Sequence, residues 1–302
     1  MSKTVLVAGA TGNLGGKVTN ALGNKGAEVR AVVRAGSNPE TVKALRATGV
    51  TIITVDMANV QELTNACAGV DCVVSALSGF RDVVIDTQKR LLDAAVGAKV
   101  PRFIPSDYSV DFTNLVPGQN RNLDMRREFH TYLDRQPIKA TTIFNGAFME
   151  LLTGDMPLIL FGLKRILCWG KPDVVMDFTT THDVADYVAN VALDTSSPRY
   201  LHIAGDRLNP RDFATLMTDL TGQQFGLLRP GGIGLFNGII KLARTLAPGK
   251  GDLYPAWQGM QYMRDMMEGR AQVPNYDTHR YPDMHWTTAR DFLVSEKVQE
   301  RV

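Results

Sequence analysis

Three glycines near the N-terminus, Gly9, Gly12 and Gly15, have a spacing that suits a phosphate-bearing ligand. The apolar residues 3–8 before them predict a β-strand, and residues 17–22 after them predict an amphipathic helix. Glycine lets the backbone turn sharply and approach a ligand, and a helix N-terminus offers unpaired N–H groups to a phosphate. The pattern predicts a dinucleotide-binding turn rather than a plain strand-to-helix connection, with contacts from Gly9, Thr11, Gly12, Asn13, Leu14 and Gly15.

Arg34, at the end of the second predicted strand (28–34), indicates which dinucleotide binds. A carboxylate at this position would hold the ribose hydroxyls of NAD, whereas an arginine suits the additional phosphate of NADP. Ser37 follows closely, so we expect both residues to hold NADP(H); the alternative is an arginine that simply faces solvent. Asp56, after the third predicted strand, could bind the adenine amino group or cap the helix that begins near Asn59.

Further polar and small residues follow the fourth, fifth and sixth predicted strands (71–77, 101–105 and 141–144). In an open parallel sheet, ligands bind outside the carboxyl ends of the strands. We therefore expect cofactor contacts from Ser75, Ala76, Leu77, Ser106, Asn145 and Phe148, and a substrate contact from Gly146.

Tyr108 comes directly after the fifth strand and is the best candidate for a proton donor or oxyanion donor; otherwise it packs against the cofactor or substrate. Arg126 could anchor a phosphate or a carbonyl oxygen, and His130, one helical turn further on, could contact substrate. The alternative for both is an ordinary solvent-exposed helix face. His182 could pair with Asp183, although this carboxylate more readily caps the following helix.

A stripe of large side chains occurs in the predicted helix 256–268, where Trp257, Met260, Met263 and Met267 lie near one face. Such a stripe is typical of a protein core. It could also form an adaptable wall for a flat aromatic ligand, because methionine is flexible and tryptophan stacks. For this second reading, Trp257 and Met260 are the candidate substrate contacts.

The elements that must position these residues alternate between strands and helices. This order predicts an α/β fold, a Rossmann-type doubly wound parallel sheet in residues 1–150, joined by a strand near 200–204. Residues 151–302 are expected to form a smaller substrate-side region over the strand ends, mainly helical after residue 206.

Composition narrows the range of functions. The 302 residues include 33 basic and 31 acidic ones, and this near balance argues against a nucleic-acid surface. No apolar run is long enough to span a bilayer, and a strand begins within four residues, so we expect no signal peptide and a cytoplasmic location. Three cysteines without metal-like spacing predict buried, reduced thiols and no metal site: Cys67, Cys72 and Cys168. A small-molecule substrate is the expected partner; a homo-oligomer or a regulatory protein partner stays open.

These features together resemble the NmrA-like and isoflavone-reductase-like group of atypical short-chain dehydrogenases/reductases. The resemblance spans the chain, is weaker beyond about residue 205, and rests on the segments 9–15, Arg34, 102–107, 145–148 and 182–186. It implies binding of NADP(H). Many members reduce aromatic, phenylpropanoid-like or quinone substrates, whereas others are redox-sensing regulators with little or no turnover.

The chain departs from this group at the proton donor. No Tyr-x-x-x-Lys occurs, and the lysine of the isoflavone-reductase branch falls on Met125 or Arg126. Arginine can anchor an oxygen but donates protons poorly. A quinone tolerates a weak acid because its reduced oxyanion is delocalised. We therefore expect an NADPH-dependent reductase of a small aromatic, quinone or enone-like substrate; the alternative is an NADP(H)-sensing regulator that binds a protein partner.

Overall fold

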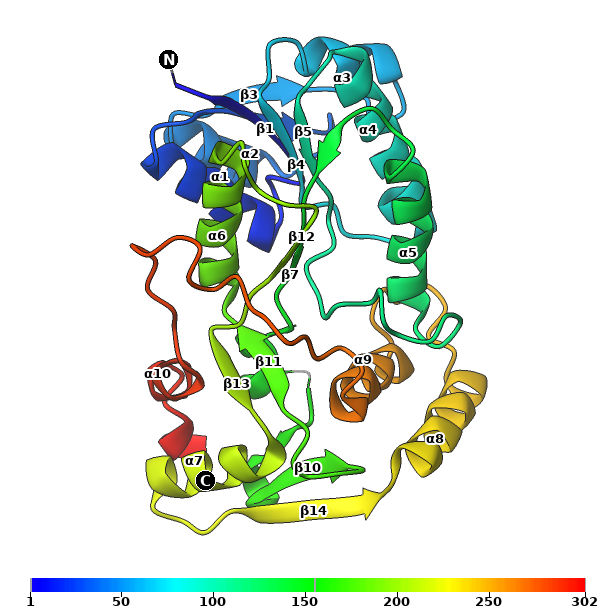
Figure 1. Cartoon of the computed structure of the whole chain (residues 1–302), viewed down its shortest axis with the longest axis vertical. Coiled ribbons are helices and arrows are strands. Elements are labelled where there is room, and N and C mark those ends of the chain that lie inside the picture. Colours follow the sequence, from blue (N-terminus) through cyan, green and yellow to red (C-terminus); the bar gives the residue numbers. More distant parts are fainter. Residues whose placement is uncertain (1, 155, 302) are drawn as a thin grey trace.

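The computed structural model describes residues 2–154 and 156–301, which form two lobes along the long axis of the molecule (Figure 1). We call the half with the large parallel sheet the upper lobe, and the half with two small sheets the lower lobe. The N-terminus lies in the upper lobe and the C-terminus in the lower lobe.

The upper lobe is built on a six-stranded sheet whose paired strands all run parallel. In spatial order its strands are β3 (Thr51–Thr54), β2 (Glu28–Val33), β1 (Thr4–Ala8), β4 (Cys72–Ser75), β5 (Arg102–Ile104) and β6 (Lys139–Ala140). Beyond Thr141, β7 (Thr142–Phe144) pairs in parallel with β12 (Tyr200–His202). All five residues of the central β1 are buried, as expected for a strand covered on both faces. The predicted Rossmann-type sheet is confirmed.

Helices cover both faces of this sheet (Figure 1). One face carries α1 (Asn13–Asn24), α2 (Pro39–Ala47) and α6 (Thr181–Leu193); the other carries α3 (Val60–Ala66), the π-helix η1 (Asp82–Thr87), α4 (Gln88–Gly97) and α5 (Arg121–Leu133). Because α6 packs against α1, the chain returns to the upper lobe after residue 180. No helix among the described residues is both long and apolar enough to cross a membrane.

The lower lobe contains two three-stranded sheets and four helices. The strands are β8 (Ala147–Phe148), β11 (Met176–Thr179) and β13 (Asp206–Leu208) in one sheet, and β9 (Ile159–Leu160), β10 (Arg165–Trp169) and β14 (Gly226–Gly231) in the other. The helices are α7 (Pro210–Thr221), α8 (Ile233–Leu246), α9 (Ala256–Glu268) and α10 (Ala289–Ser295), with short 3-10 turns η2 (Met149–Thr153), η3 (Phe161–Leu163) and η4 (Val298–Arg301).

The strand β14 departs from the expected mainly helical region after residue 206. Proline and glycine usually break regular structure, yet Pro230 and Gly231 both lie within the strand. Proline is tolerated there because β14 is at the edge of its sheet, where a missing N–H costs no ladder bond.

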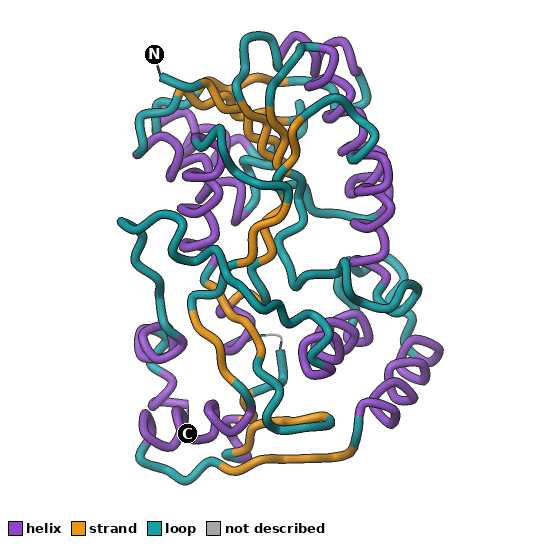
Figure 2. The backbone as a smooth tube through the Cα atoms, viewed as in Figure 1, coloured by secondary structure: helices purple, strands orange, loops and turns teal. Residues whose placement is uncertain are grey.

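The loop after α9 crosses the middle of the molecule on its way to α10 (Figure 2) and meets β12 at His202. We call residues 270–288 the C-terminal strap. Within it, the Asp277 N–H donates to the His202 carbonyl at 2.7 Å, and the Asp277 carboxylate accepts from the His202 N–H at 2.9 Å. The Tyr187 hydroxyl of α6 donates to the Asp277 carbonyl at 3.1 Å. The strap therefore pairs with His202, the last residue of β12, and is also bonded to α6.

All three cysteines are buried, as expected. Burial raises the pKa of the Cys67 thiol to about 11 and that of the Cys72 thiol to about 12. Thiols with such pKa values carry little thiolate at neutral pH and are chemically inert.

Candidate active site

The glycine turn links the end of β1 to α1 in a conformation that requires glycine. Gly9 has a φ of +87°, and a Cβ there would lie 2.5 Å from the Ala76 carbonyl oxygen. A Cβ on Gly15 would lie 2.1 Å from the Gly9 oxygen. Side chains at these positions are therefore excluded by the close packing of β1, α1 and the end of β4.

The N-terminus of α1 is open to a ligand. Its N-cap, Gly12, provides no side-chain cap, and the first turn contains no acid. Six other helices are capped by their own side chains: Asn38, Asn59, Asn120, Thr180, Asn209 and Thr288. Thr11, Gly12 and Asn13 are exposed beside the uncapped N–H groups. The predicted residues of the turn thus fit the diphosphate of a dinucleotide.

Buried polar atoms without a partner among the described residues mark the neighbouring strand ends. They are Ser75 Oγ at β4, Asp107 Oδ1 after β5 and Asn145 Oδ1 after β7. Buried polar groups are normally hydrogen-bonded, so these atoms fit the hydroxyl and amide groups of a bound cofactor. Ser75 and Asn145 were predicted as contacts; Asp107 was not.

The other residues predicted at the strand ends divide into two groups. Leu14, Ala76 and Phe148 pack against one hydrophobic cluster of the upper lobe. Ser106 is occupied internally, because its hydroxyl donates to the Leu77 carbonyl at 2.8 Å and its N–H donates to Gln88. We therefore reassign Ser106, and with it the Leu77 carbonyl, to holding the loop after β5.

Gly146 lies against β11 in a conformation that favours glycine. Its φ is +68°, and a Cβ would lie 2.2 Å from the Asp177 carbonyl oxygen of β11. A neighbouring strand therefore fills the side where a side chain would project, and a substrate contact by the Gly146 backbone stays a prediction.

A hollow of about 290 Å³ lies beyond the end of β2. It is lined by the predicted Arg34 and Ser37, and also by Lys43 and Arg46 of α2, one turn apart. Among the described residues, none of these three cations has a carboxylate within 4.0 Å. Three positive charges around one hollow suit a dianionic phosphate. The i,i+3 spacing of Lys43 and Arg46 was a signal in the sequence that could have identified them.

Asp56 does not cap α3. Its carboxylate accepts from the Ala58 N–H at 2.8 Å, while Asn59 caps the helix. The capping alternative is therefore wrong, and the adenine contact stays a prediction.

Tyr108 is buried, and its hydroxyl donates to the Ser75 carbonyl at 3.2 Å. Burial raises the pKa of Tyr108 far above its ordinary value, and the nearby Asp107 adds to the shift. A phenol whose O–H already donates to a carbonyl, and which ionises with difficulty, is a poor proton donor. The structure therefore favours the packing alternative for Tyr108.

Arg126 and His130 are both buried, so their assignment to a solvent-exposed helix face is wrong. Arg126 donates from Nε to the Ser106 carbonyl at 3.1 Å and from Nη1 to the Asn122 carbonyl at 3.1 Å. Its guanidinium is therefore fixed beside the loop that leaves β5. A run of charged residues on a helix predicts a solvent-exposed face, but here the loop after β5 covers these side chains.

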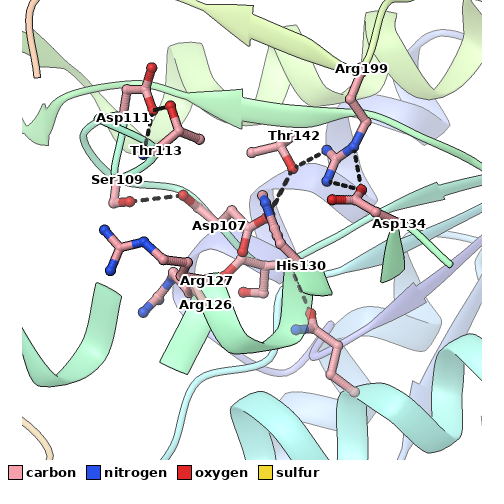
Figure 3. Close-up of polar contacts among 12 residues, drawn as sticks. Asp107, Ser109, Asp111, Thr113, Arg126, Arg127, His130, Asp134, Thr142 and Arg199 are labelled. Carbon is pink, nitrogen blue, oxygen red and sulfur yellow. Dashed lines mark hydrogen bonds and ion pairs between the residues drawn. The ribbon is translucent and has the colours of Figure 1, made fainter. Parts of the chain in front are cut away.

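Figure 3 shows the polar chain that begins at His130. His130 Nε2 lies 2.5 Å from Asp107 Oδ2, and the Thr142 hydroxyl donates to the same oxygen at 2.9 Å. Arg199 donates to Thr142 Oγ1 at 2.8 Å and pairs with Asp134 at the surface. The chain locks the residues after β5 to α5 and β7.

Ion pairing keeps Asp107 ionised in the interior. Burial alone would raise the pKa of this carboxyl, but the charge and hydrogen bond of His130, with Arg126 nearby, hold it below its ordinary value. Asp111 behaves in the same way: against the effect of burial, hydrogen bonds from His202 and Thr113 lower its pKa.

These depressed pKa values predict acid sensitivity. Each pair contributes stability above about pH 4, the ordinary pKa of an aspartate, and this contribution is lost as the pH falls further through the folded pKa. Denaturant unfolding between pH 7 and pH 3 should show a steeper loss of unfolding free energy in the wild type than in Asp107→Asn. Parallel curves would contradict this prediction.

His182 does not pair with Asp183. It is exposed, and its partner within 4 Å is Asp186 at 3.7 Å. Thr180, rather than Asp183, caps α6, and the Asp183 carboxylate accepts from the Thr287 N–H at 2.9 Å. The role predicted for Asp183 as a cap is therefore wrong, because it ties the C-terminal strap to α6.

The stripe on α9 belongs mainly to the core. Trp257 is buried; the guanidinium groups of Arg121 and Arg244 lie 4.8 and 5.1 Å from the centre of its ring, and its Nε1–H donates to the Pro248 carbonyl. A substrate contact is therefore not assigned to Trp257. Met260 is partly buried against the lower-lobe core, and its substrate contact stays a prediction.

Comparisons with known proteins agree with this arrangement. The model of the NmrA-like family matches residues 1–229. Pinoresinol reductase 1 of Arabidopsis thaliana is 28% identical over 212 residues, a match that spans 66% of the chain and 66% of that protein. Oxidoreductase swnN of Metarhizium robertsii is 25% identical over 336 aligned positions, covering 96% of each chain.

Solved structures share the fold over nearly the whole chain. AtPrR2 with NADP+ and (+)pinoresinol has a TM-score of 0.81 at 21% identity and covers 100% of this chain and 99% of its own. The NADPH-dependent quinone oxidoreductase QOR2 from Escherichia coli, complexed with NADPH, has a TM-score of 0.76 at 20% identity, covering 97% and 99%. The predicted cofactor agrees with those held by these neighbours. The chain belongs to the NmrA-like family.

Proposed function

We propose that the protein is an NADPH-dependent reductase of a small aromatic, quinone or enone-like substrate. The observation that carries this proposal is the pairing of an uncapped α1 N-terminus with the three-cation hollow of Arg34, Lys43 and Arg46. Its relatives and structural neighbours include a pinoresinol reductase and a quinone oxidoreductase.

Each group of residues has a defined task in this proposal. The glycine turn would hold the diphosphate, the hollow beyond β2 would hold the 2′-phosphate, and the unpartnered atoms of Ser75 and Asn145 would orient the nicotinamide end. When bound, NADPH supplies the hydride. Arg126, fixed at the end of β5, adds a permanent positive charge that stabilises an oxygen becoming negative.

The test follows NADPH absorbance with a panel of quinones, enones and phenylpropanoids. We expect turnover with at least one of these classes, and a loss of turnover in Arg126→Ala because the fixed charge is removed. Cofactor binding is measured separately for both proteins. Tight NADPH binding without turnover across the whole panel would contradict the reductase function.

A further inference from the structure

A second hollow, of about 810 Å³, lies at the edge of the upper sheet opposite the glycine turn. Its lining includes residues at the starts of β1, β4, β5 and β6, four adjacent parallel strands that are aligned through Val5, Cys72, Arg102 and Lys139. We call it the strand-start hollow. The glycine turn and the other predicted cofactor contacts follow the opposite ends of the strands, so this hollow is separate from the candidate active site.

Basic side chains dominate the polar lining of the strand-start hollow. Four cations line it: Lys3, Lys99, Arg102 and Lys139. Its one carboxylate, that of Asp71, accepts from the Thr4 N–H at 2.8 Å. Among the described residues, none of the four cations has a carboxylate oxygen within 4.0 Å. A hollow lined by charges of one sign attracts ions of the other sign.

Arg102 shows most clearly that a counter-ion is missing. It is 4% exposed, and its guanidinium donates to uncharged acceptors, the Asp194 carbonyl at 2.5 Å and Thr141 Oγ1 at 2.6 Å. Its Nε has no partner in the part of the chain that the structure describes. The Asp194 carboxylate pairs with Arg280 instead, at 2.8 Å. Because buried charges are normally paired, an anion in the adjoining hollow would supply the missing counter-charge.

Helix ends supply part of this compensation. The helices α4 and α6 both end at the hollow, and Lys3 donates to the Leu193 carbonyl of α6 at 2.7 Å. Each helix C-terminus carries about half a negative elementary charge, so the two ends balance about one of the four cations, and Asp71 balances another. About two positive charges remain, the number that one phosphate monoester neutralises near pH 7.

A second wall of the hollow is apolar. It comes from the ends of α4 and α6 and from the segments before β5 and β6: Val96, Val100, Pro101, Pro137, Ile138 and Ala192. Inorganic phosphate would leave this wall in water, whereas a ligand with an apolar body would cover it. The volume lies within the range of small-molecule sites. The lining therefore suits an organic molecule that carries a phosphate group.

We propose that the strand-start hollow is a second ligand site, which binds a small organic phosphate. The phosphate would lie between Lys99 and Lys139, whose side chains are exposed and can reach it, with Arg102 as the buried counter-charge. Lysine binds phosphate as a point charge, without the planar geometry that favours a carboxylate. The site goes beyond the proposed reductase function, because hydride transfer takes place at the other edge of the sheet. A ligand bound here stabilises the folded upper lobe by mass action.

The probe is phenyl phosphate, titrated by calorimetry into the full-length protein saturated with NADPH. Saturation fills the anion sites at the glycine turn and beyond β2. We expect one phenyl phosphate per chain, with an affinity that falls as the salt concentration rises. Inorganic phosphate should bind at least about threefold more weakly, because it leaves the apolar wall uncovered.

Substitutions in the hollow should change the affinity in both directions. Lys99→Ala and Lys139→Ala should each weaken phenyl phosphate binding by about three- to tenfold, since each removes a charge-assisted contact. Asp71→Asn should strengthen binding by about two- to fivefold, because it removes the repelling carboxylate and keeps an oxygen that can accept from Thr4. A purely structural role of Asp71 would not produce such a gain.

Lys297→Ala is the matched control for Lys99→Ala. Both lysines are exposed and have a positive φ, 51° at Lys297 and 58° at Lys99, so alanine changes the backbone preference in the same way at each. Lys297 follows α10 in the lower lobe and is not among the residues that line the hollow. Its alanine variant should bind phenyl phosphate as the wild type does.

Arginine side-chain NMR places the probe directly. The Nε–H signals of Arg102 and Arg126 are identified by their loss in Arg102→Lys and Arg126→Lys. Phenyl phosphate should shift the Arg102 signal and leave that of Arg126 in place. A shift of the Arg126 signal alone would put the probe in the candidate active site and overturn the proposal.

Two further outcomes would also overturn it. A Kd for phenyl phosphate weaker than about 10 mM would mean that the cations serve only the helix ends. An affinity unchanged in both Lys99→Ala and Lys139→Ala would mean that the probe binds elsewhere. None of these measurements depends on turnover, so the reductase function is tested separately.

Discussion

Replacement of His130 by alanine is expected to lower the free energy of unfolding by about 3–5 kcal/mol, the usual cost of removing one partner of a buried ion pair. The Asp107 carboxylate would remain fully buried, with its ion-pair partner at 2.5 Å removed. Its remaining donor, the Thr142 hydroxyl, carries no charge. Urea denaturation at neutral pH measures this loss.

Two variants calibrate this measurement. His182→Ala removes a histidine that is 75% exposed and should change the free energy by less than about 0.5 kcal/mol. The double variant Asp107→Leu, His130→Leu removes both members of the pair and should be more stable than His130→Ala, because the Asp107 carboxylate is no longer buried without its partner. If His130→Ala has the same free energy of unfolding as the wild type, the His130–Asp107 pair contributes nothing to stability.

The second large effect is expected when the cations beyond the end of β2 are removed. The affinity for NADPH should fall, whereas the affinity for NADH should not. Arg34→Ala should weaken NADPH binding by about 10–100-fold, because a hydrogen bond to a charged group contributes about 1.5–3 kcal/mol. Lys43→Ala should act in the same direction. NADH, which lacks the 2′-phosphate, should bind both variants as it binds the wild type. Fluorescence titration with each cofactor measures these affinities.

Lys99→Ala is the matched control, since Lys99 lies between α4 and β5 in the strand-start hollow with Lys3 and Asp71, at the N-terminal ends of the strands and away from the cations beyond β2. Its affinity for NADPH should equal that of the wild type. Equal affinity of the wild type for NADPH and NADH would contradict the phosphate assignment of Arg34 and Lys43.

The sheet and the cofactor turn could be predicted because their signals are local. Short apolar strands, glycine spacing and Arg34 at a strand end depend on neighbours in the sequence. The edge strand β14 was missed because Pro230 and Gly231 are residue types that usually interrupt a strand. They are tolerated here because β14 lies at the edge of its sheet, which the sequence does not reveal.

The candidate site depends on contacts between distant segments, which no local pattern contains. Arg126 and His130 occupy a helix with a charged pattern, and their burial follows from Ser106 and Asp107 of the loop after β5. The bond of Gln258 to Asn120 likewise depends on the register of α9 on α5, more than a hundred residues away in the chain. Composition alone pointed to the methionine face of α9 and away from its polar face.

The C-terminal strap has a consequence for synthesis and truncation. The N–H and the carbonyl of His202, the last residue of β12, are both bonded to Asp277, and α6, which also belongs to this lobe, is tied to the strap through Asp183 and Tyr187. A nascent chain therefore completes its dinucleotide-binding half only after nearly the whole polypeptide has left the ribosome. A fragment that ends at residue 150 would lack β12 and leave β7 without its partner, so we expect it to pair with other chains more readily than the full chain does.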